Sequence, residues 1–370
     1  MKLSYWEYKT WLSHIDFTIV GSGIVGLNCA LQLRAKYPEA KILVLEKGIL
    51  PQGASTKNAG FACFGSISEI LSDLKTHTEE EVYELVEKRW KGIHLLRENL
   101  GDKEIGFKNW GGHEVFTEQQ EVLFTECLEQ IASTNSFLNP IFKGDAFKVH
   151  SNTFDFKKLQ EEYITNVFES QIDTGKMMSQ LLLRVQSSGV ILLNSIEVEH
   201  FEDLEDHVVV KTNEFEFRTK KLIIATNGFG AALLEEEVKP ARAQVLITKP
   251  IKDLKIKGTF HLDEGYYYFR NIDNRILFGG GRNLDFKAEE TSAFGETPLV
   301  QNKLEQLLKE QILPDYDFEI AYSWSGIMGV GPQKRPIIKQ VSNRVYCGIR
   351  MGGMGIAIGS IIGKELADLV

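Results

Sequence analysis

The chain has 370 residues and a mass of 41.9 kDa, which leaves room for two domains or for one domain with a large insertion. Hydrophobic residues make up 43% and charged residues 25%, a composition typical of soluble globular proteins. The formal net charge of −9 argues against a nucleic-acid or anionic-membrane partner, because either would favour a basic face.

Nothing in the sequence indicates a metal site, a disulfide framework or a targeting segment. Residues 1–14 lack the apolar run of a signal peptide, and the long apolar stretch 345–363 contains Arg350 and many glycines, which suit a buried turn and helix better than a membrane span. The cysteines are scattered without a C-x-x-C pair: Cys29, Cys63, Cys127 and Cys347. We therefore expect no metal ion and a reducing, cytoplasmic location.

Residues 15–20 are apolar and β-rich, as in a buried parallel strand, and a glycine motif follows them directly. Gly21, Gly23 and Gly26 have the G-x-G-x-x-G spacing. The first glycine allows a tight turn, the second lets a pyrophosphate approach the backbone, and the third lets helix and strand pack closely. We expect Ile24 and Val25 to contact the dinucleotide with them.

The next elements complete a dinucleotide-binding unit. Helical periodicity over 27–33 would place the phosphates at a helix N-terminus, where free N–H groups and the dipole favour anions. Glu46 ends the second strand, where its carboxylate can accept both ribose hydroxyls, and Lys47 follows it. These residues predict a bound adenine dinucleotide and do not distinguish NAD from FAD.

The rest of the chain alternates between helical and strand patterns. We expect helices over 78–100, 118–133, 171–186 and the second half of 286–313. We expect strands over 107–115, 190–193, 198–217, 222–228, 244–248, 265–270 and 275–281, with Asp273-Asn274 as a hairpin turn. The tail returns to a strand at 344–348, a glycine turn and a helix. The nucleotide domain is thus expected to be interrupted by two pieces of a β-rich domain.

Three further stretches resemble a known family. Residues 53–60 (Gly-Ala-Ser-Thr-Lys-Asn-Ala-Gly) resemble the Gly-Ala-Ser-x-x-Asn-x-Gly segment of the D-amino-acid-oxidase superfamily of FAD-dependent oxidoreductases. Residues 222–228 resemble its second nucleotide-contacting strand, and 346–359 its C-terminal glycine-rich turn and helix. With 324–327 and 334–338 the resemblance spans nearly the whole chain, and the most similar subgroup contains the sarcosine, glycine and γ-glutamylputrescine oxidases.

The resemblance implies an α/β fold, with a Rossmann-like FAD-binding domain of the glutathione-reductase type and an inserted α+β substrate domain on a mostly antiparallel sheet. The FAD-binding domain would comprise residues 1–80, 172–240 and 325–370. The substrate domain would comprise 81–171 and 241–324.

The resemblance also implies the remaining cofactor contacts. Small residues at 53–60 let backbone N–H groups approach a flat ring, and the helix after Gly355 can point its N-terminus at the flavin N1/C2=O edge. The implied contacts are Ser55, Lys57, Asn58, Ala59, Gly60, Val198, Ala225, Thr226, Gly228, Gly326, Gly352, Gly353, Met354, Gly355 and Ile356. Ser55 and Asn58 have turn capping as an alternative role.

The chain departs from the family pattern at several positions. Thr56 and Lys57 replace a common Gly-Arg pair, and Met354 stands where many relatives have histidine. Some relatives attach FAD through a cysteine in the segment that matches 324–332, and this chain has none there. We therefore expect non-covalent FAD.

The substrate-side candidates lie in one expected strand and in the tail. Alternation would place Tyr266, Tyr268 and Arg270 on one face. In glycine-oxidase-like enzymes a tyrosine and an arginine hold the substrate carboxylate. Tyr266 matches that tyrosine, whereas the family arginine aligns near Gly353, so that Arg350 is the nearest substitute. Alternatively, the tyrosines pack the sheet and Arg270 pairs with an acid.

Lys249 and His261 could serve in oxygen activation or substrate contact, but we expect both at the surface. The expected activity is oxidation of the C–N bond of an amino acid or related amine, by hydride transfer to flavin N5, with O₂ as acceptor giving H₂O₂. Two alternatives stay open: an FAD-dependent 2-hydroxy-acid dehydrogenase, and a flavin-binding protein without catalysis.

Overall fold

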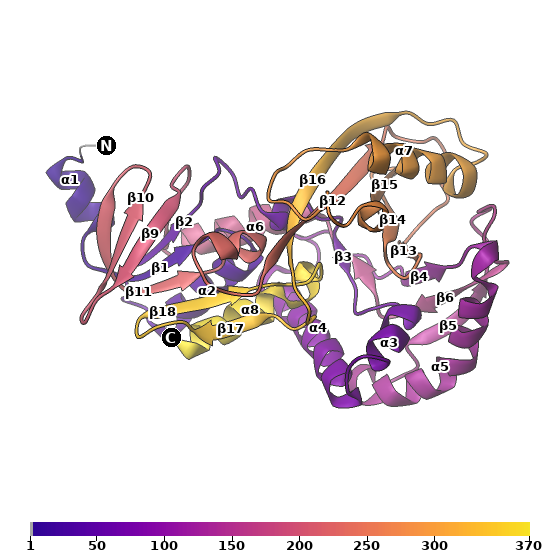
Figure 1. The fold of residues 1–370 in the computed structure, drawn as a ribbon, viewed down its shortest axis with the longest axis horizontal. Helices are drawn as coiled ribbons and strands as arrows, with labels where there is room; N and C mark the ends of the chain where they lie inside the picture. Colours follow the sequence, from indigo (N-terminus) through magenta and orange to yellow (C-terminus); the bar gives the residue numbers. More distant parts are fainter. Residues whose placement is uncertain (1–2) are drawn as a thin grey trace.

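Two eight-stranded sheets, each with its own helices, organise the molecule (Figure 1). The computed structural model describes residues 3–370. The first sheet draws on segments 15–45, 191–224 and 337–349, and the second on 112–166 and 239–330. The expected mixed α/β fold with an interrupted nucleotide-binding sheet is confirmed.

The first sheet has the strand order β17-β18-β11-β1-β2-β8, and β9 and β10 join it beside β11. Pairing is parallel from β18 through β8, and β17, β9 and β10 are antiparallel. The bounds are β1 (Ile15–Val20), β2 (Ile42–Leu45), β8 (Ile191–Leu193), β9 (Val198–Asp203), β10 (Val208–Thr212), β11 (Glu216–Ile224), β17 (Ile337–Gln340) and β18 (Val345–Ile349). The central strands are apolar because both faces are covered.

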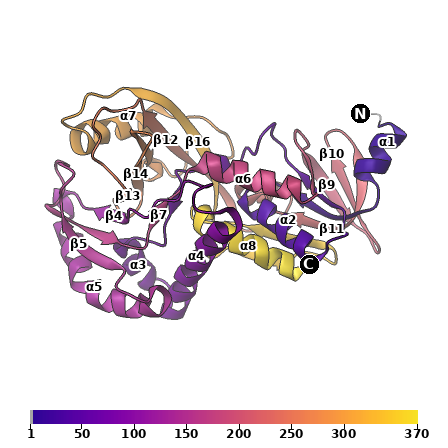
Figure 2. The same ribbon diagram turned by 180° about the vertical axis from the view of Figure 1, so that it is seen from behind.

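Helices cover one face of this sheet, and the N-terminal segment with the β9–β10 hairpin covers the other. Phe17 and Ile19 of β1 pack in the core on the helical side, and Val20 packs in the core on the opposite side. The helices are α2 (Ile24–Lys36), α4 (Glu79–Leu100), α6 (Thr174–Ser187) and α8 (Gly355–Leu369). α2 packs between α6 and α8 (Figure 2), and α4 packs on α8. The C-terminal helix therefore returns to the first glycine motif.

The second sheet has the order β16-β12-β15-β14-β13-β4-β6-β5 and is antiparallel except between β13 and β4. Its bounds are β4 (Gly112–Val115), β5 (Phe147–Ser151), β6 (Glu162–Asn166), β12 (Lys239–Thr248), β13 (Thr259–Leu262), β14 (Tyr267–Ile272), β15 (Arg275–Gly280) and β16 (Ile320–Val330). The predicted hairpin turn is confirmed, since Asp273 and Asn274 have φ values of 50° and 56°, as a two-residue turn between these strands requires.

The two faces of the second sheet differ in chemistry. Phe260, Phe269 and Phe278 form a row across β13, β14 and β15 and pack under α7 (Pro298–Leu307). The opposite face carries a second row, from His261 through Tyr268 and Gly279 to Val245. Because side chains alternate along a strand, this second row faces the nucleotide-binding half.

The remaining elements are short or lie at the junction of the two halves. β3 (Phe61–Ala62) and β7 (Ser170–Gln171) form a two-stranded sheet, and α3 (Ile67–Leu74) and α5 (Glu121–Phe142) complete the second half. α1 (Tyr5–Glu7) is a single helical turn. Short 3-10 or π-helical segments lie at Tyr8–Leu12, Ala54–Thr56, Glu118–Gln120, Asn227–Ala232, Arg282–Leu284 and Leu308–Ile312. Among residues 3–370, no helix combines the length and the apolar character needed to cross a bilayer.

Two predicted helices have different bounds. The helix expected over 171–186 begins at Thr174, because the Asp173 carboxylate accepts the N–H of Lys176 at 2.9 Å and caps it, while Gln171 belongs to β7. The helix expected over 118–133 continues to Phe142. β12 and β16 also run past the expected domain limits at 241 and 324, and the division into domains stays a prediction.

Candidate cofactor and substrate site

A cavity of about 1000 Å³ lies between the two halves. The nucleotide-binding half lines it with the first glycine turn, the loop 52–60, the start of β9, the segment 225–233 and the tail 351–356. The second half lines it with Val245, His261 and Tyr268 from the row described above. Every residue predicted to bind the cofactor lines this cavity except Gly26, which lies beneath Gly21.

The first glycine turn has no space for side chains. Gly21 has φ of +104°, and a Cβ there would lie 2.8 Å from the carbonyl oxygen of Ala225. A Cβ on Gly26 would lie 2.0 Å from the carbonyl oxygen of Gly21. Ser55 accepts the N–H of Ile24 through its hydroxyl at 2.9 Å, so the loop 53–60 is held against the first turn of α2. The turn thus presents bare backbone and a helix N-terminus to the cavity, as an adenine dinucleotide requires.

Glu46 is buried at the cavity edge and is oriented by its own loop. Its Oε2 accepts the N–H and the hydroxyl of Ser22 at 3.1 and 2.7 Å. Its Oε1 accepts the N–H groups of Gly48 and Gln52 at 3.0 and 3.3 Å. Ser22 lies within the glycine motif and was not among the predicted residues. The carboxylate therefore has a fixed direction, and its contact with a ribose stays a prediction.

Asn58 braces the loop that contains it. Its amide nitrogen donates to the carbonyl oxygens of Ala54 and Ser55 at 3.1 and 2.8 Å. Its amide oxygen accepts the N–H of Gly60 at 2.8 Å and the hydroxyl of Thr174 at 2.9 Å. All four hydrogen-bonding positions of the amide are thus used within the protein. The turn-capping alternative holds for Asn58.

The C-terminal turn supplies the other wall of the cofactor region. Gly352 and Gly353 have φ of 60° and 84°, and α8 begins two residues later at Gly355. Met354 lies before this helix, and its Sδ is 3.6 Å from the Sγ of Cys63. Because residues 351–356 line the cavity, the positive end of α8 faces it.

Of the predicted substrate-side residues, the two tyrosines line the cavity. The ring of Tyr268 meets the ring of Phe61 edge to face, with the centroids 5.6 Å apart, and burial raises the pKa of its phenol to about 12. Tyr266 precedes β14, is 40% exposed and packs against Phe286. Tyr268 therefore belongs to the wall of the cavity and Tyr266 to its rim.

The two predicted arginines do not line the cavity, which corrects their expected role. Arg270 shares the face of Tyr268, but its Nη1 donates to the carbonyl oxygens of Gly60 and Ile172 at 3.1 and 2.6 Å. Burial lowers the pKa of Arg270 to about 10. Arg350 donates to the carbonyl oxygens of Arg335 and Glu237 at 3.1 and 3.0 Å. Both guanidinium groups support backbone turns, and neither is presented to a substrate carboxylate.

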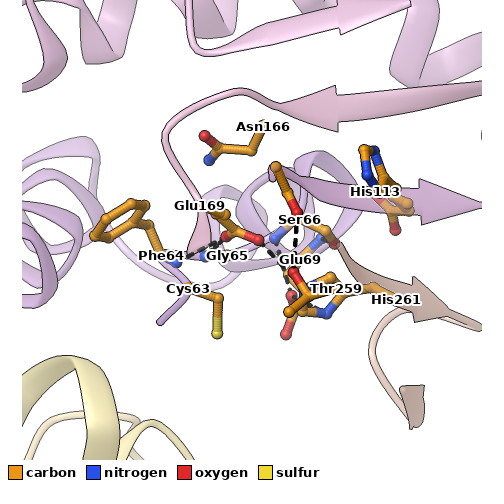
Figure 3. Close-up of polar contacts among 12 residues, drawn as sticks. Cys63, Phe64, Gly65, Ser66, Glu69, His113, Asn166, Glu169, Thr259 and His261 are labelled. Atoms are coloured by element: carbon orange, nitrogen blue, oxygen red, sulfur yellow. Dashed lines mark hydrogen bonds and ion pairs between the residues drawn. The ribbon is translucent and has the colours of Figure 1, made fainter. Parts of the chain in front are cut away.

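His261 is buried in the cavity wall, so the expectation of a surface position was wrong. Figure 3 shows its ring beside Glu69 and Glu169. Its Nε2 lies 3.4 Å from Glu169 Oε2, and its Nδ1 lies 3.9 Å from Glu69 Oε2. Burial alone would lower the pKa of this imidazole, but Glu169, with Glu69 and Glu114, raises it to about 9. Lys249 does lie at the surface, where it pairs with Glu319 at 2.6 Å.

Two further buried carboxylates were missed in the sequence. Glu169 accepts the N–H groups of Phe64 and Gly65 at 2.7 and 3.1 Å through Oε1 (Figure 3). Glu114 accepts the N–H and the hydroxyl of Ser68, and burial raises the pKa of Glu114 to about 7. A charged residue inside the short strand Gly112–Val115 was a signal for Glu114. Glu169 lies in a loop, and the residues next to it in the sequence do not indicate that its carboxylate is buried.

A smaller cavity of about 710 Å³ adjoins the first and shares Glu69, Glu264, Tyr266 and Lys334 with it. Lys334 pairs with Asp73 at 2.5 Å, and the next residue, Arg335, pairs with Glu84 at 3.0 Å. The segment 331–335 is thereby connected to α3 and α4 at the smaller cavity. No ion pair of Glu69 or Glu264 with a lysine or arginine occurs in the described part of the chain.

Comparisons with known proteins agree with this geometry. A family profile described as FAD dependent oxidoreductase (DAO) matches residues 16–369. The chain is 21% identical over 378 residues to gamma-glutamylputrescine oxidoreductase of Escherichia coli (strain K12), covering 96% of this chain and 83% of that protein. It is 23% identical over 368 residues to mitochondrial L-2-hydroxyglutarate dehydrogenase of Caenorhabditis briggsae, with coverages of 93% and 81%. Iminodiacetate oxidase from Chelativorans sp. BNC1 has a similar structure, with a TM-score of 0.76, 18% identity and coverages of 95% and 94%.

Proposed function

The chain belongs to the DAO family of FAD dependent oxidoreductases, and on that premise we propose that it oxidises the C–N bond of an amine without a carboxylate beside the reacting carbon. The family establishes an enzyme that uses FAD. The cavity is consistent with that cofactor, because its glycine turn excludes side chains and two helix N-termini, those of α2 and α8, face it.

The positions of the charged groups carry this proposal. A substrate carboxylate is usually bound by a forked arginine, and the two arginines that could have served donate to backbone carbonyls instead. Among the cationic residues that do line the cavity, Arg89 is buried and donates from Nη1 to the carbonyl oxygen of Phe64 at 2.6 Å, while Lys334 pairs with Asp73 and Lys47 with Glu197. Lys57 and Arg282 line the cavity too, and their charged groups lie over the rings of Phe294 and Phe286, at 5.2 and 4.9 Å from the ring centroids. Glu69 and Glu264 line the cavity as well, and their charge favours an ammonium ion.

The residues of the cavity would bind and orient the amine. Phe61 and Tyr268 form an aromatic wall for the alkyl part, and Glu69 attracts the ammonium group as it enters. Bound FAD supplies the two-electron acceptor for the C–H bond next to nitrogen. The ammonium group loses a proton to solvent before the oxidation, and water then hydrolyses the resulting imine to a carbonyl compound and ammonia or, from a secondary amine, a smaller amine. We propose O₂ as the final acceptor, which yields H₂O₂.

Anaerobic reduction of the purified yellow protein tests the proposal. We expect simple alkylamines and diamines to bleach the flavin absorbance faster than sarcosine, proline or D-amino acids at equal concentration, and H₂O₂ to form when air is admitted. Faster bleaching by a carboxylate-bearing amine would overturn the proposed substrate class. Bleaching by a 2-hydroxy acid alone would point to the alternative dehydrogenase, and reduction by dithionite alone to a flavin-binding protein without catalysis.

A further inference from the structure

Three donor atoms of different chemistry converge beside the cavity, and two of their residues, Cys63 and His261, line it. The three atoms are the thiol sulfur of Cys63, a carboxylate oxygen of Glu169 and a ring nitrogen of His261, and all lie within 4.8 Å of one another. All three residues are buried, and Figure 3 shows their side chains gathered in one place. Thiolate, carboxylate and imidazole are the ligand types that Zn²⁺ prefers.

The fold holds these residues in place from three separate elements. The register of β3 with β7 pairs Phe61 with Gln171 and Ala62 with Ser170, so that Cys63 and Glu169 follow on opposite strands at the same end. His261 comes from β13 of the large sheet. The two N–H groups that bind Glu169 Oε1 leave its Oε2 directed at the imidazole.

Two of the donor atoms lack a hydrogen bond although they are buried. Glu169 Oε2 and His261 Nε2 lie 3.4 Å apart, and neither forms a hydrogen bond within the described chain. Donor atoms bound tetrahedrally to Zn²⁺ at ordinary bond lengths lie about 3.4 Å apart. The Sδ of Met354, 3.6 Å from the Cys63 sulfur, places a second soft atom beside the group.

We propose that Cys63, Glu169 and His261 bind one Zn²⁺ ion. The thiolate and the carboxylate neutralise its two charges, so that the loaded site carries no net charge in a buried position. Binding displaces the proton of the thiol and any proton on the imidazole, and both leave to solvent, so that affinity increases with pH. Cys63 and His261 line the cavity, which gives the ion a path from solvent.

The test is metal binding to the FAD-loaded protein after removal of metal by a chelator. One equivalent of Zn²⁺ added at pH 8 should stay with the protein through gel filtration, and elemental mass spectrometry should find one zinc per chain. Cys63→Ser and His261→Asn should each weaken binding more than about tenfold. Cys29→Ser, which removes a buried thiol that does not line the cavity, should bind as the unaltered protein does.

The melting temperature and FAD content of each variant without metal show whether it is folded. Failure of the unaltered protein to retain zinc, or equal retention by a folded Cys63→Ser variant, would overturn the proposal and leave Glu169 and His261 as an ion pair around a proton. Because the readout is bound metal and not turnover, the result is independent of the substrate proposed above.

Discussion

At the scale of single residues, the cavity shows why a side chain's hydrogen bonds matter more than its type. Arg270 and Asn58 stand at positions where sequence favoured ligand contacts, yet their polar atoms are used by the backbone around them. His261 stands where sequence favoured solvent, yet carboxylates surround it. In each case the partner comes from a distant segment.

Arg270→Gln tests the structural role of that arginine. The variant leaves the carbonyl oxygens of Gly60 and Ile172 with a shorter and uncharged donor, so we expect a loss of about 2–4 kcal/mol in the free energy of unfolding. The ratio of kcat/KM for a carboxylate-bearing amine to that for a matching alkylamine should stay unchanged. Thermal unfolding and steady-state kinetics measure the two effects. A selective loss toward the carboxylate would restore Arg270 as a substrate ligand.

Asn58→Ala should loosen the loop that faces the cofactor. The change removes four hydrogen bonds, two of which satisfy backbone groups of residues 54 and 55, and each is worth about 1 kcal/mol. We expect a lower melting temperature and at least tenfold faster loss of FAD on dilution. Asn343→Ala, at an exposed turn, is the matched control and should change neither. Unchanged FAD retention in Asn58→Ala would contradict the bracing role.

His113 predicts a pH dependence of stability. Burial lowers its pKa from 6.5 to about 4 in the folded protein. Between these values the unfolded chain binds a proton that the folded chain does not, so the free energy of unfolding falls as the pH falls from about 6.5 to 4, by at most about 3 kcal/mol from this residue. Glu114, whose pKa burial raises to about 7, acts in the opposite sense over this range, so the test compares two proteins. Between pH 7 and pH 5, urea unfolding should show the free energy of unfolding changing less favourably in the unaltered protein than in His113→Asn. An equal change in both proteins would remove His113 as a source of the pH dependence.

At the scale of elements, features set by the local sequence pattern could be predicted, and features set by the pairing of distant strands could not. The strand–glycine–helix unit at 15–36 was recognisable because each requirement is local: apolar alternation, missing side chains and helical periodicity. The row from Glu114 through His261 to Tyr268 could not be recognised in the sequence, because these residues become neighbours only when β4, β13 and β14 pair in one register. A shift by one residue would direct His261 to the opposite face.

Gly26→Ala tests the close approach of α2 to its preceding turn. The added Cβ would lie 2.0 Å from the carbonyl oxygen of Gly21, so the turn must move, and we expect the purified variant to contain little FAD. Gly144→Ala is the control, since the nearest atom to a Cβ there is 3.6 Å away, an ordinary contact, and Gly144 does not line the cavity. Flavin absorbance relative to protein absorbance measures both. Full FAD content in Gly26→Ala would show that the turn can adapt.

At the scale of the whole molecule, the cavity depends on the return of the C-terminal segment to the N-terminal motif. α8 packs on α2, and the turn before it lines the cavity together with the loop 53–60. The second sheet then covers the open side with the face that carries His261 and Tyr268. The cofactor region is thus made mainly by one half of the chain, and the substrate region requires both.

Acid precipitation tests the predicted non-covalent attachment of FAD. We expect the yellow colour to stay in the supernatant, because no cysteine occurs in the segment 324–332 through which some relatives attach the cofactor. Among the four cysteines only Cys63 lines the cavity. If colour remains in the pellet, Cys63→Ser shows whether this thiol forms the bond. Colour in the pellet from that variant too would exclude every thiol at the cavity.

The sequence by itself determined the parts of this protein whose function depends on local backbone. The glycine motif, the loop 53–60 and the glycine-rich tail identify an FAD enzyme. Short runs of neighbouring residues determine where the backbone lacks side chains and where a helix begins, and these are the features that bind the cofactor. Only the tertiary structure decided which charged groups face the substrate. Burial and pairing of Arg270, Glu169 and His261 arise from contacts between segments about 100 residues apart or more, and no local pattern records them.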